Sequence, residues 1–222
     1  MVVGQPCVGV SDVLGRQRQQ DAFVAPVAEL SCEEIEQIEK RSSFTVLYVG
    51  KYIPLHGVEV IVKSAKLLER ENIKFIFVGK GQLYESIRGM VDENRIENIE
   101  FIEWLDRSEL RQLIKSCHVV LGIFKGDGKA MRVVPNKVYD ALACGSLVIT
   151  ANTPAIREFF KDKEELILVE PGEPQDLAEK ILWVYTNENE GKNIAKRGHR
   201  KFFEIASFDV LGNRLKEIIL GS

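Results

Sequence analysis

Six short apolar runs with almost no polar alternation follow one another from residue 44 onward. They are residues 44–50, 73–79, 98–104, 118–124, 146–150 and 165–170. Runs of this kind are typical of strands whose two faces are both covered by helices. Segments with helical spacing of apolar residues lie between them, at 58–70, 83–95, 108–117 and 135–144. This alternation predicts a Rossmann-like α/β domain with a doubly wound parallel sheet of about six strands.

The two ends of the chain show other patterns. Residues 1–30 have no regular period, and Ser31 with Glu34 has the form of a capping box that opens a charged helix. After Glu170 the pattern is helical, at 176–188, 192–206 and 208–220, the last weakened by Gly212. We therefore expect an N-terminal extension or connector at 1–43, one α/β domain at 44–206 and a C-terminal helix at 207–222.

Composition narrows the class of protein. Of 222 residues, 45% are hydrophobic and 28% charged, as in a soluble globular protein, and the net charge of -3 argues against bulk nucleic-acid binding. The four cysteines are too scattered for a zinc site, and Cys117 and Cys144 have apolar neighbours typical of the core. No apolar run approaches the roughly 20 residues needed to span a bilayer, and the first residues lack signal-peptide features. The expected location is the cytoplasm.

Ligands of open parallel sheets bind beyond the carboxyl ends of the strands. Here the predicted strands end at Gly50-Lys51, Gly79-Lys80-Gly81, Trp104-Leu105, Phe124-Lys125-Gly126 and Thr150-Ala151. Glycine followed by lysine brings backbone amides and a cation to one place, which suits a phosphate. Lys80 is equally compatible with a solvated loop.

The histidines divide into one candidate and two structural or solvated residues. His56 precedes Gly57 at a helix start, where its imidazole meets a phosphate or serves as a capping or packing residue. His118 opens a buried strand and is expected to be structural. His199 lies on a basic helix face and is expected to be solvated.

The stretch 121–150 carries the densest chemistry. A buried run leads into a basic, glycine-punctuated loop with Lys125, Lys129 and Arg132, and Lys137 follows Pro135 at a helix start. Asp140 falls among apolar residues, where it would accept hydrogen bonds from ribose hydroxyls or pair with Lys137 at a spacing of three. The pattern predicts an anion site for the phosphates of a nucleotide-activated substrate.

Other chemistries lack their motifs. The segment GKGQLY at 79–84 has Tyr84 where a dinucleotide fingerprint needs its third glycine. No serine sits between two glycines in a strand-to-helix elbow, and no Asp-x-Asp pair is present to hold a metal-bridged diphosphate. Neutralisation of phosphate by lysine and arginine, without a metal or cofactor, is the expected route.

Four segments resemble, in order, a known family: VLYVGKYIPLHGVEVIVKSAKLL, FIFVGKGQ, NIEFIEWLDRSEL and LGIFKGDGKAMRVVPNKVYDALACGSLVITANTPAIREFF. Over about residues 44–210 the chain is similar to the C-terminal, donor-binding domain of retaining glycosyltransferases with the GT-B architecture, of the glycosyl transferases group 1 type. The resemblance implies a hexosyltransferase whose nucleotide diphosphate sugar, a UDP- or GDP-sugar, lies between two Rossmann-like domains.

The resemblance also implies roles for single residues. Lys51 matches the strand-end cation that contacts the donor diphosphate, and His56 stands where many members have a second lysine. Asp140 matches the second acid of a paired motif, which bonds the ribose, whereas Arg132 replaces the first acid. No residue is assigned as catalytic with certainty, but Lys51 and Arg132 are expected to stabilise the leaving group, and Lys125 to be solvated. The expected substrate-binding set is Gly50, Lys51, His56, Gly57, Gly79, Lys80, Trp104, Leu105, Lys129, Arg132, Asn136, Lys137 and Asp140, with the backbone of Trp104 and Leu105 meeting the base.

A complete enzyme of this family has a second domain for the acceptor, and residues 1–43 are too few to form one. The chain is then an excised domain, a truncated product or one half of a two-chain enzyme, with its N-terminal acceptor domain supplied in cis or in trans. Peripheral membrane association through that absent half is compatible with the resemblance. The alternative functions are a nucleotide-sugar-binding or regulatory module without turnover and a related epimerase or phosphorylase.

Overall fold

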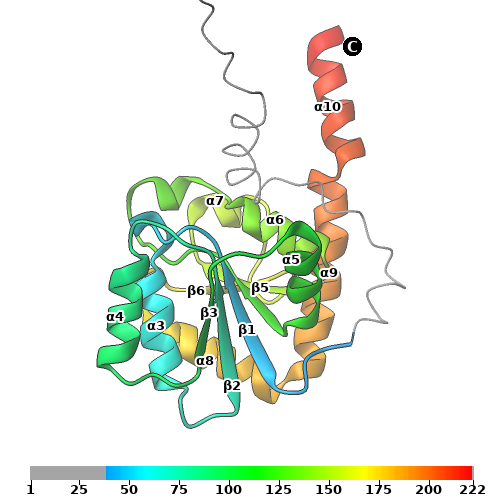
Figure 1. Ribbon diagram of the computed structural model, residues 1–222. Helices are drawn as coiled ribbons and strands as arrows, with labels where there is room; N and C mark the ends of the chain where they lie inside the picture. The colour runs from blue at the N-terminus through cyan, green and yellow to red at the C-terminus, as the bar shows by residue number, and fades with distance from the viewer. Residues whose placement is uncertain (1–38, 222) are drawn as a thin grey trace, which may run out of the picture.

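The computed structural model describes residues 39–221 and shows a parallel sheet between two layers of helices (Figure 1). The six strands lie in the order β3-β2-β1-β4-β5-β6, and all of the paired strands run parallel. Their bounds are β1 Phe44–Val49, β2 Ile73–Val78, β3 Ile99–Ile102, β4 Val119–Leu121, β5 Leu147–Ala151 and β6 Ile167–Val169. The prediction of a doubly wound, Rossmann-like sheet is confirmed, although the strands are shorter than the apolar runs.

The expected helices form with small differences in their bounds. They are α3 Val58–Leu67, α4 Tyr84–Glu93, α5 Arg107–Ser116, α6 Asn136–Ala143, α8 Pro174–Thr186, α9 Glu188–Ala206 and α10 Phe208–Leu220. Three short elements were not predicted: the 3-10 helices η2 (Pro54–His56) and η3 (Gly128–Arg132), and α7 (Pro154–Arg157). The expected capping box of Ser31 and Glu34, and the segment 1–30, lie outside the described residues.

The strands pack on both faces because their side chains alternate between two apolar layers. In β1, Val46 and Tyr48 face the layer that contains α3, α4 and α8, whereas Leu47 and Val49 face α5 and α6. Cys117 and Cys144 are buried and free, as expected of core cysteines. The described residues include no helix with the length and apolar character that crossing a lipid bilayer requires.

One prediction about the helical layers is wrong. His199 is buried rather than solvated, with an exposed fraction of 1%, and its Nδ1 lies 2.8 Å from the carbonyl oxygen of Leu142. Because a carbonyl only accepts, Nδ1 carries the proton in this contact. Gly198 next to it packs against the backbone of Glu165, so His199 lies on the buried face of α9, whereas Arg200 remains exposed. His118 is structural, as expected, since Nδ1 accepts a hydrogen bond from Thr45 N.

Candidate functional site at the switch point of the sheet

The strand order reverses between β1 and β4, and the loops that follow these two strands meet beyond their carboxyl ends. The amide of Phe124 donates to the carbonyl oxygen of His56 at 3.0 Å, which ties the two loops together. Gly57 has a φ of +63°, and a Cβ there would lie 2.8 Å from the backbone nitrogen of Lys125. Only glycine allows this approach, so Gly57 sets the distance between the two loops.

Lys137 is the most unusual group at this edge. It lies in the first turn of α6, and its Nζ is buried without a hydrogen-bond partner among residues 39–221. The ammonium stands 4.4 Å from the centre of the Tyr48 ring, and a Cβ at Gly50 would lie 2.5 Å from Nζ. Burial lowers the pKa of this lysine from 10.5 to about 7. A buried cation without an anion is costly, which is the condition of a site built for a ligand.

The expected alternative of a Lys137–Asp140 pair is wrong. The structure shows neither a hydrogen bond nor an ion pair between them, because Lys137 reaches away to the space above Gly50. Asp140, one turn further into α6, is half-buried, and burial raises the pKa of its carboxyl to about 7. Its carboxyl oxygens remain able to accept hydrogen bonds from a ligand.

His56 faces the same point from η2. Its Nδ1 lies 2.8 Å from the hydroxyl of Tyr48, and its Cε1 would lie 3.3 Å from a Cβ at Gly50. Burial first, and then the charge of Lys137, lowers the pKa of His56 to about 4. The imidazole is therefore neutral at pH 7, and it can offer a hydrogen bond but no charge to a ligand.

The other expected site residues lie around this cluster with different degrees of exposure. Lys51, Lys129, Arg132 and Asn136 are exposed. The amide of Gly50 donates to Val78 O at 3.0 Å and that of Gly79 to Ile102 O at 2.8 Å, so both are engaged within the sheet. Lys80 is exposed and paired with Glu103 at 2.9 Å, and the partly exposed Lys125 contacts Asp127 at 3.6 Å.

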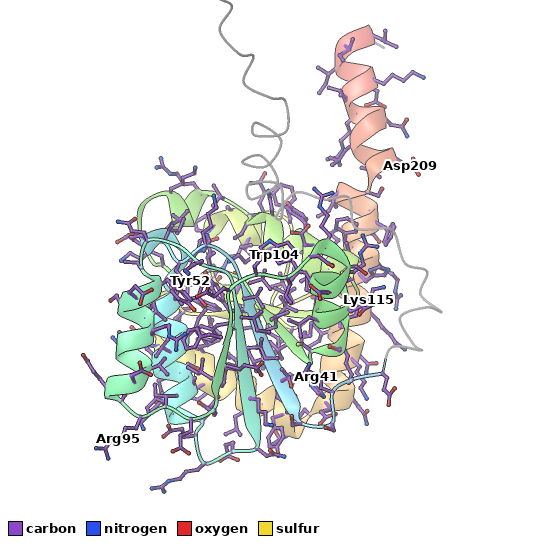
Figure 2. The ribbon with its side chains drawn as sticks, in the orientation of Figure 1. Arg41, Tyr52, Arg95, Trp104, Lys115 and Asp209 are labelled. Atoms are coloured by element: carbon purple, nitrogen blue, oxygen red, sulfur yellow. The ribbon has the colours of Figure 1, made fainter. Side chains whose placement is uncertain are left out.

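Trp104 and Leu105, which were expected to contact the base, follow β3 and differ in how far they are buried. Trp104 is 65% exposed, and in Figure 2 it lies at the upper, carboxyl edge with Tyr52, opposite Arg41 and Arg95. Leu105 packs against the core on the α5 and α6 side. Tyr48 was not among the expected site residues, because a tyrosine inside an apolar strand run has the pattern of a core residue.

The stability of the wild type is expected to fall as the pH rises from about 4 to 7, and Asp140→Asn should abolish this fall. Because its folded pKa is raised from 3.8 to about 7, Asp140 contributes stability that is fully present below pH 3.8 and lost as the pH rises through 7. Urea denaturation at several pH values between about 4 and 8 measures this. Asp92→Asn, on the exposed side of α4, is the control and should keep the wild-type slope. An unchanged slope in Asp140→Asn would contradict the shifted pKa.

No metal centre is visible in the described part of the chain. Residues 39–221 contain no group of three or more His, Cys, Asp or Glu side chains arranged to hold a metal ion.

A six-stranded, doubly wound parallel sheet with loops meeting at its switch point places the protein in the Rossmann class of α/β domains. The model of the family described as glycosyl transferases group 1 matches residues 32–201, so the chain belongs to this family. It is 27% identical over 152 residues to the uncharacterized glycosyltransferase MJ1178 of Methanocaldococcus jannaschii, a match that covers 68% of this chain and 41% of that protein.

Solved structures show the same fold. The C-terminal domain of a glycosyl transferase group 1 family protein, LpcC of Francisella tularensis, matches with a TM-score of 0.64 at 17% identity, over 86% of this chain and 98% of that one. Anabaena Alr3699/HepE in complex with UDP-glucose matches with a TM-score of 0.69 at 16% identity, over 97% of this chain and 54% of that one. The chain thus has the fold of the C-terminal domain of a GT-B glycosyltransferase and spans 41% of the length of the curated relative MJ1178.

Proposed function

We propose that this chain is the donor-binding domain of a hexosyltransferase. It binds a nucleotide diphosphate sugar, a UDP- or GDP-sugar, and serves the transfer of the glycosyl group with retention and without a metal ion. The observation that carries the proposal is the buried, unpartnered ammonium of Lys137 above Gly50 at the switch point. The family match and the UDP-glucose bound to the related Anabaena protein support it.

In this proposal the diphosphate lies over Gly50 and takes a charge-assisted hydrogen bond from Lys137. The imidazole of His56, held by the Tyr48 hydroxyl, lies beside the same phosphate, and Gly57 keeps the two neighbouring loops close together. The exposed cations Lys51, Lys129 and Arg132 surround the remaining phosphate oxygens. The nucleoside extends to Asp140, which accepts from the ribose hydroxyls, and to the backbone of Trp104 and Leu105, which meets the base.

The chemistry that these groups support is stabilisation of a leaving group. When the bond between the anomeric carbon and the diphosphate oxygen breaks, the electron pair stays on that oxygen as negative charge. Fixed cations stabilise this charge more in the transition state than in the ground state, which is the condition for catalysis. Lys51 and Arg132 are proposed for this role, with Lys137 holding the other phosphate. The acceptor hydroxyl bonds to the anomeric carbon on the face that the diphosphate leaves, and its proton passes to the departing diphosphate oxygen.

We propose residues 44–206 as the donor-binding unit, residues 207–222 as the C-terminal helix, and 1–43 as a connector to a second domain that binds the acceptor. Helix α10 extends past the carboxyl edge of the sheet (Figure 1) and exposes an apolar stripe of Leu211, Leu215, Ile218 and Ile219. Exposed apolar surface of this kind favours a covering partner. The chain alone is then expected to bind donor and to transfer sugar poorly, with activity restored by the acceptor domain in cis or in trans.

Titration calorimetry with UDP, GDP and their sugars tests this function on the full chain. Binding of at least one of them to a folded sample is the expected result, and absence of binding for all of them would exclude a donor site. Arg132 in place of an acid favours a second candidate, a nucleotide-sugar-binding module without turnover. Transferase activity of this chain with an acceptor-domain partner would eliminate that candidate.

Arg132→Ala is expected to weaken binding of UDP or GDP by about tenfold and to leave binding of the bare nucleoside unchanged, because a lost bond to a charged group costs about 1.5 kcal/mol or more. Calorimetric titration of both ligands measures the difference. The control is Arg41→Ala, an exposed arginine at the opposite edge of the sheet (Figure 2). Equal losses for nucleotide and nucleoside would place the phosphates elsewhere.

A further inference from the structure

Tyr48 is a buried aromatic residue near the end of β1, with an exposed fraction of 0%. Its ring packs at 5.6 Å from that of Phe77, its register partner in β2, and edge-on at 5.8 Å from Tyr52. These neighbours hold the ring in one place. Two of its other contacts go to Lys137 and His56, beside Gly50, and a residue with only a packing role does not need them.

The first contact is between the ring face and Lys137, whose Nζ lies 4.4 Å from the ring centre. An ammonium over an aromatic face is attracted by the negative π-cloud, and the attraction is strongest when water is excluded. Since Nζ has no hydrogen-bond partner among the described residues, this face is the one favourable contact that the structure shows for its charge.

The second contact is made by the hydroxyl, which lies 2.8 Å from His56 Nδ1 and 3.1 Å from the carbonyl oxygen of Lys51. The hydroxyl has one proton to donate. Because the Lys51 carbonyl only accepts, the hydroxyl donates its proton there and accepts a hydrogen bond from His56 Nδ1–H. Tyr48 therefore fixes the orientation of the His56 ring as well as the place of Lys137.

We propose that Tyr48 is a positioning residue that holds Lys137 with its ring face and His56 with its hydroxyl, so that both side chains are fixed beside one phosphate above Gly50. This inference rests on the proposed donor site and deepens it. Three groups converge on that point, because a Cβ at Gly50 would lie 2.5 Å from Lys137 Nζ, 3.1 Å from Tyr48 Oη and 3.3 Å from His56 Cε1. Without the ring, the flexible lysine would be free to turn to solvent.

A nucleotide-free measurement tests the ring contact. NMR of the full chain with isotope-labelled lysine should show the Lys137 ε-methylene signals shifted upfield by the ring current of Tyr48. The shift should persist in Tyr48→Phe, which keeps the ring, and disappear in Tyr48→Leu. Lys137 signals at their ordinary positions in the wild-type spectrum would overturn the proposal, and this result requires no variant to fold.

A double-mutant cycle with UDP, or with GDP if that is the nucleotide bound, tests the consequence. Tyr48→Leu should weaken binding about tenfold in the wild type and less than about threefold in a Lys137→Met background, because the ring then has nothing to hold. Phe75→Leu, which removes another fully buried ring of β2, is the matched control for a lost core ring, and Tyr52→Phe for a lost buried hydroxyl. Neither should change affinity.

The two proposals fail in different ways. Equal losses from Tyr48→Leu in both backgrounds would overturn the positioning role while leaving the donor site intact. Absence of nucleotide binding in the wild type would refute the donor site, and the lysine spectrum would still decide whether Tyr48 holds Lys137.

Discussion

Lys137→Met is expected to weaken nucleoside diphosphate binding by about 30- to 100-fold and to make the protein more stable. The affinity falls because a buried, charge-assisted hydrogen bond to phosphate contributes about 2–3 kcal/mol. The free energy of unfolding rises by about 1–3 kcal/mol, because methionine fills the same space without burying an unpartnered ammonium. Calorimetric titration and urea denaturation of the two proteins measure both changes.

Lys125→Met is the control, because Lys125 is the nearby lysine that contacts Asp127 and has no proposed role. It should leave affinity and stability close to wild type. The stability change in Lys137→Met also has a pH signature. The folded pKa of Lys137 is lowered from 10.5 to about 7, so the unfolded chain binds the extra proton between these values and wild-type stability rises with pH there. Loss of stability in Lys137→Met at pH 7 would show that the ammonium has a partner.

Gly57→Ala is expected to lower the free energy of unfolding by about 2–4 kcal/mol. A φ of +63° is strained for alanine, at a cost of about 1–2 kcal/mol, and its Cβ would press against the backbone of Phe124 and Lys125 at 2.9 and 2.8 Å. These neighbours are backbone atoms, which cannot turn aside as a flexible side chain can, so the loops that follow β1 and β4 must separate. Urea denaturation measures the stability, and nucleotide titration should show a parallel loss of affinity.

Gly89→Ala is the matched control for that substitution. Gly89 lies within α4, and a Cβ there would meet nothing within 4 Å. Alanine has the higher helix propensity, so this variant should be more stable by up to about 1 kcal/mol. A Gly57→Ala protein as stable as wild type would show that the two loops are not held at the distance seen in the structure.

The pattern of apolar positions was sufficient to predict the sheet, because strands covered on both faces and helices covered on one differ in period. The capping box at the start of α5 has its own local signal, an Asp106 followed three residues later by Glu109, and its two reciprocal bonds measure 2.8 and 2.9 Å. The apolar pattern did not predict η2, η3 or α7, since single turns leave no period to detect. The bounds of the strands depend on pairing between distant segments, and β4 has three residues within a longer apolar run.

The site was predictable only where its residues are local in sequence. Glycines and cations after strands point to the carboxyl edge, and Lys137 was among the candidates. Of the two alternatives left open for Asp140, the pair with Lys137 is wrong, because spacing along a helix does not show that a long side chain can reach the neighbouring strand. Tyr48 and His199 illustrate the same limit: the first lies under a lysine 89 positions away, and the second is buried by the close approach of α9.

The most direct measurement is calorimetric titration of the folded full chain with UDP and GDP at about pH 8, repeated in buffers of different ionisation enthalpy. Lys137 is mainly neutral there in the free protein, because burial lowers its pKa to about 7, and an ammonium is favoured once the diphosphate is bound. The expected result is binding of one nucleotide with uptake of a proton, lost in Lys137→Met. Failure of both nucleotides to bind, or binding that is indifferent to Lys137→Met, would contradict a donor diphosphate site above Gly50.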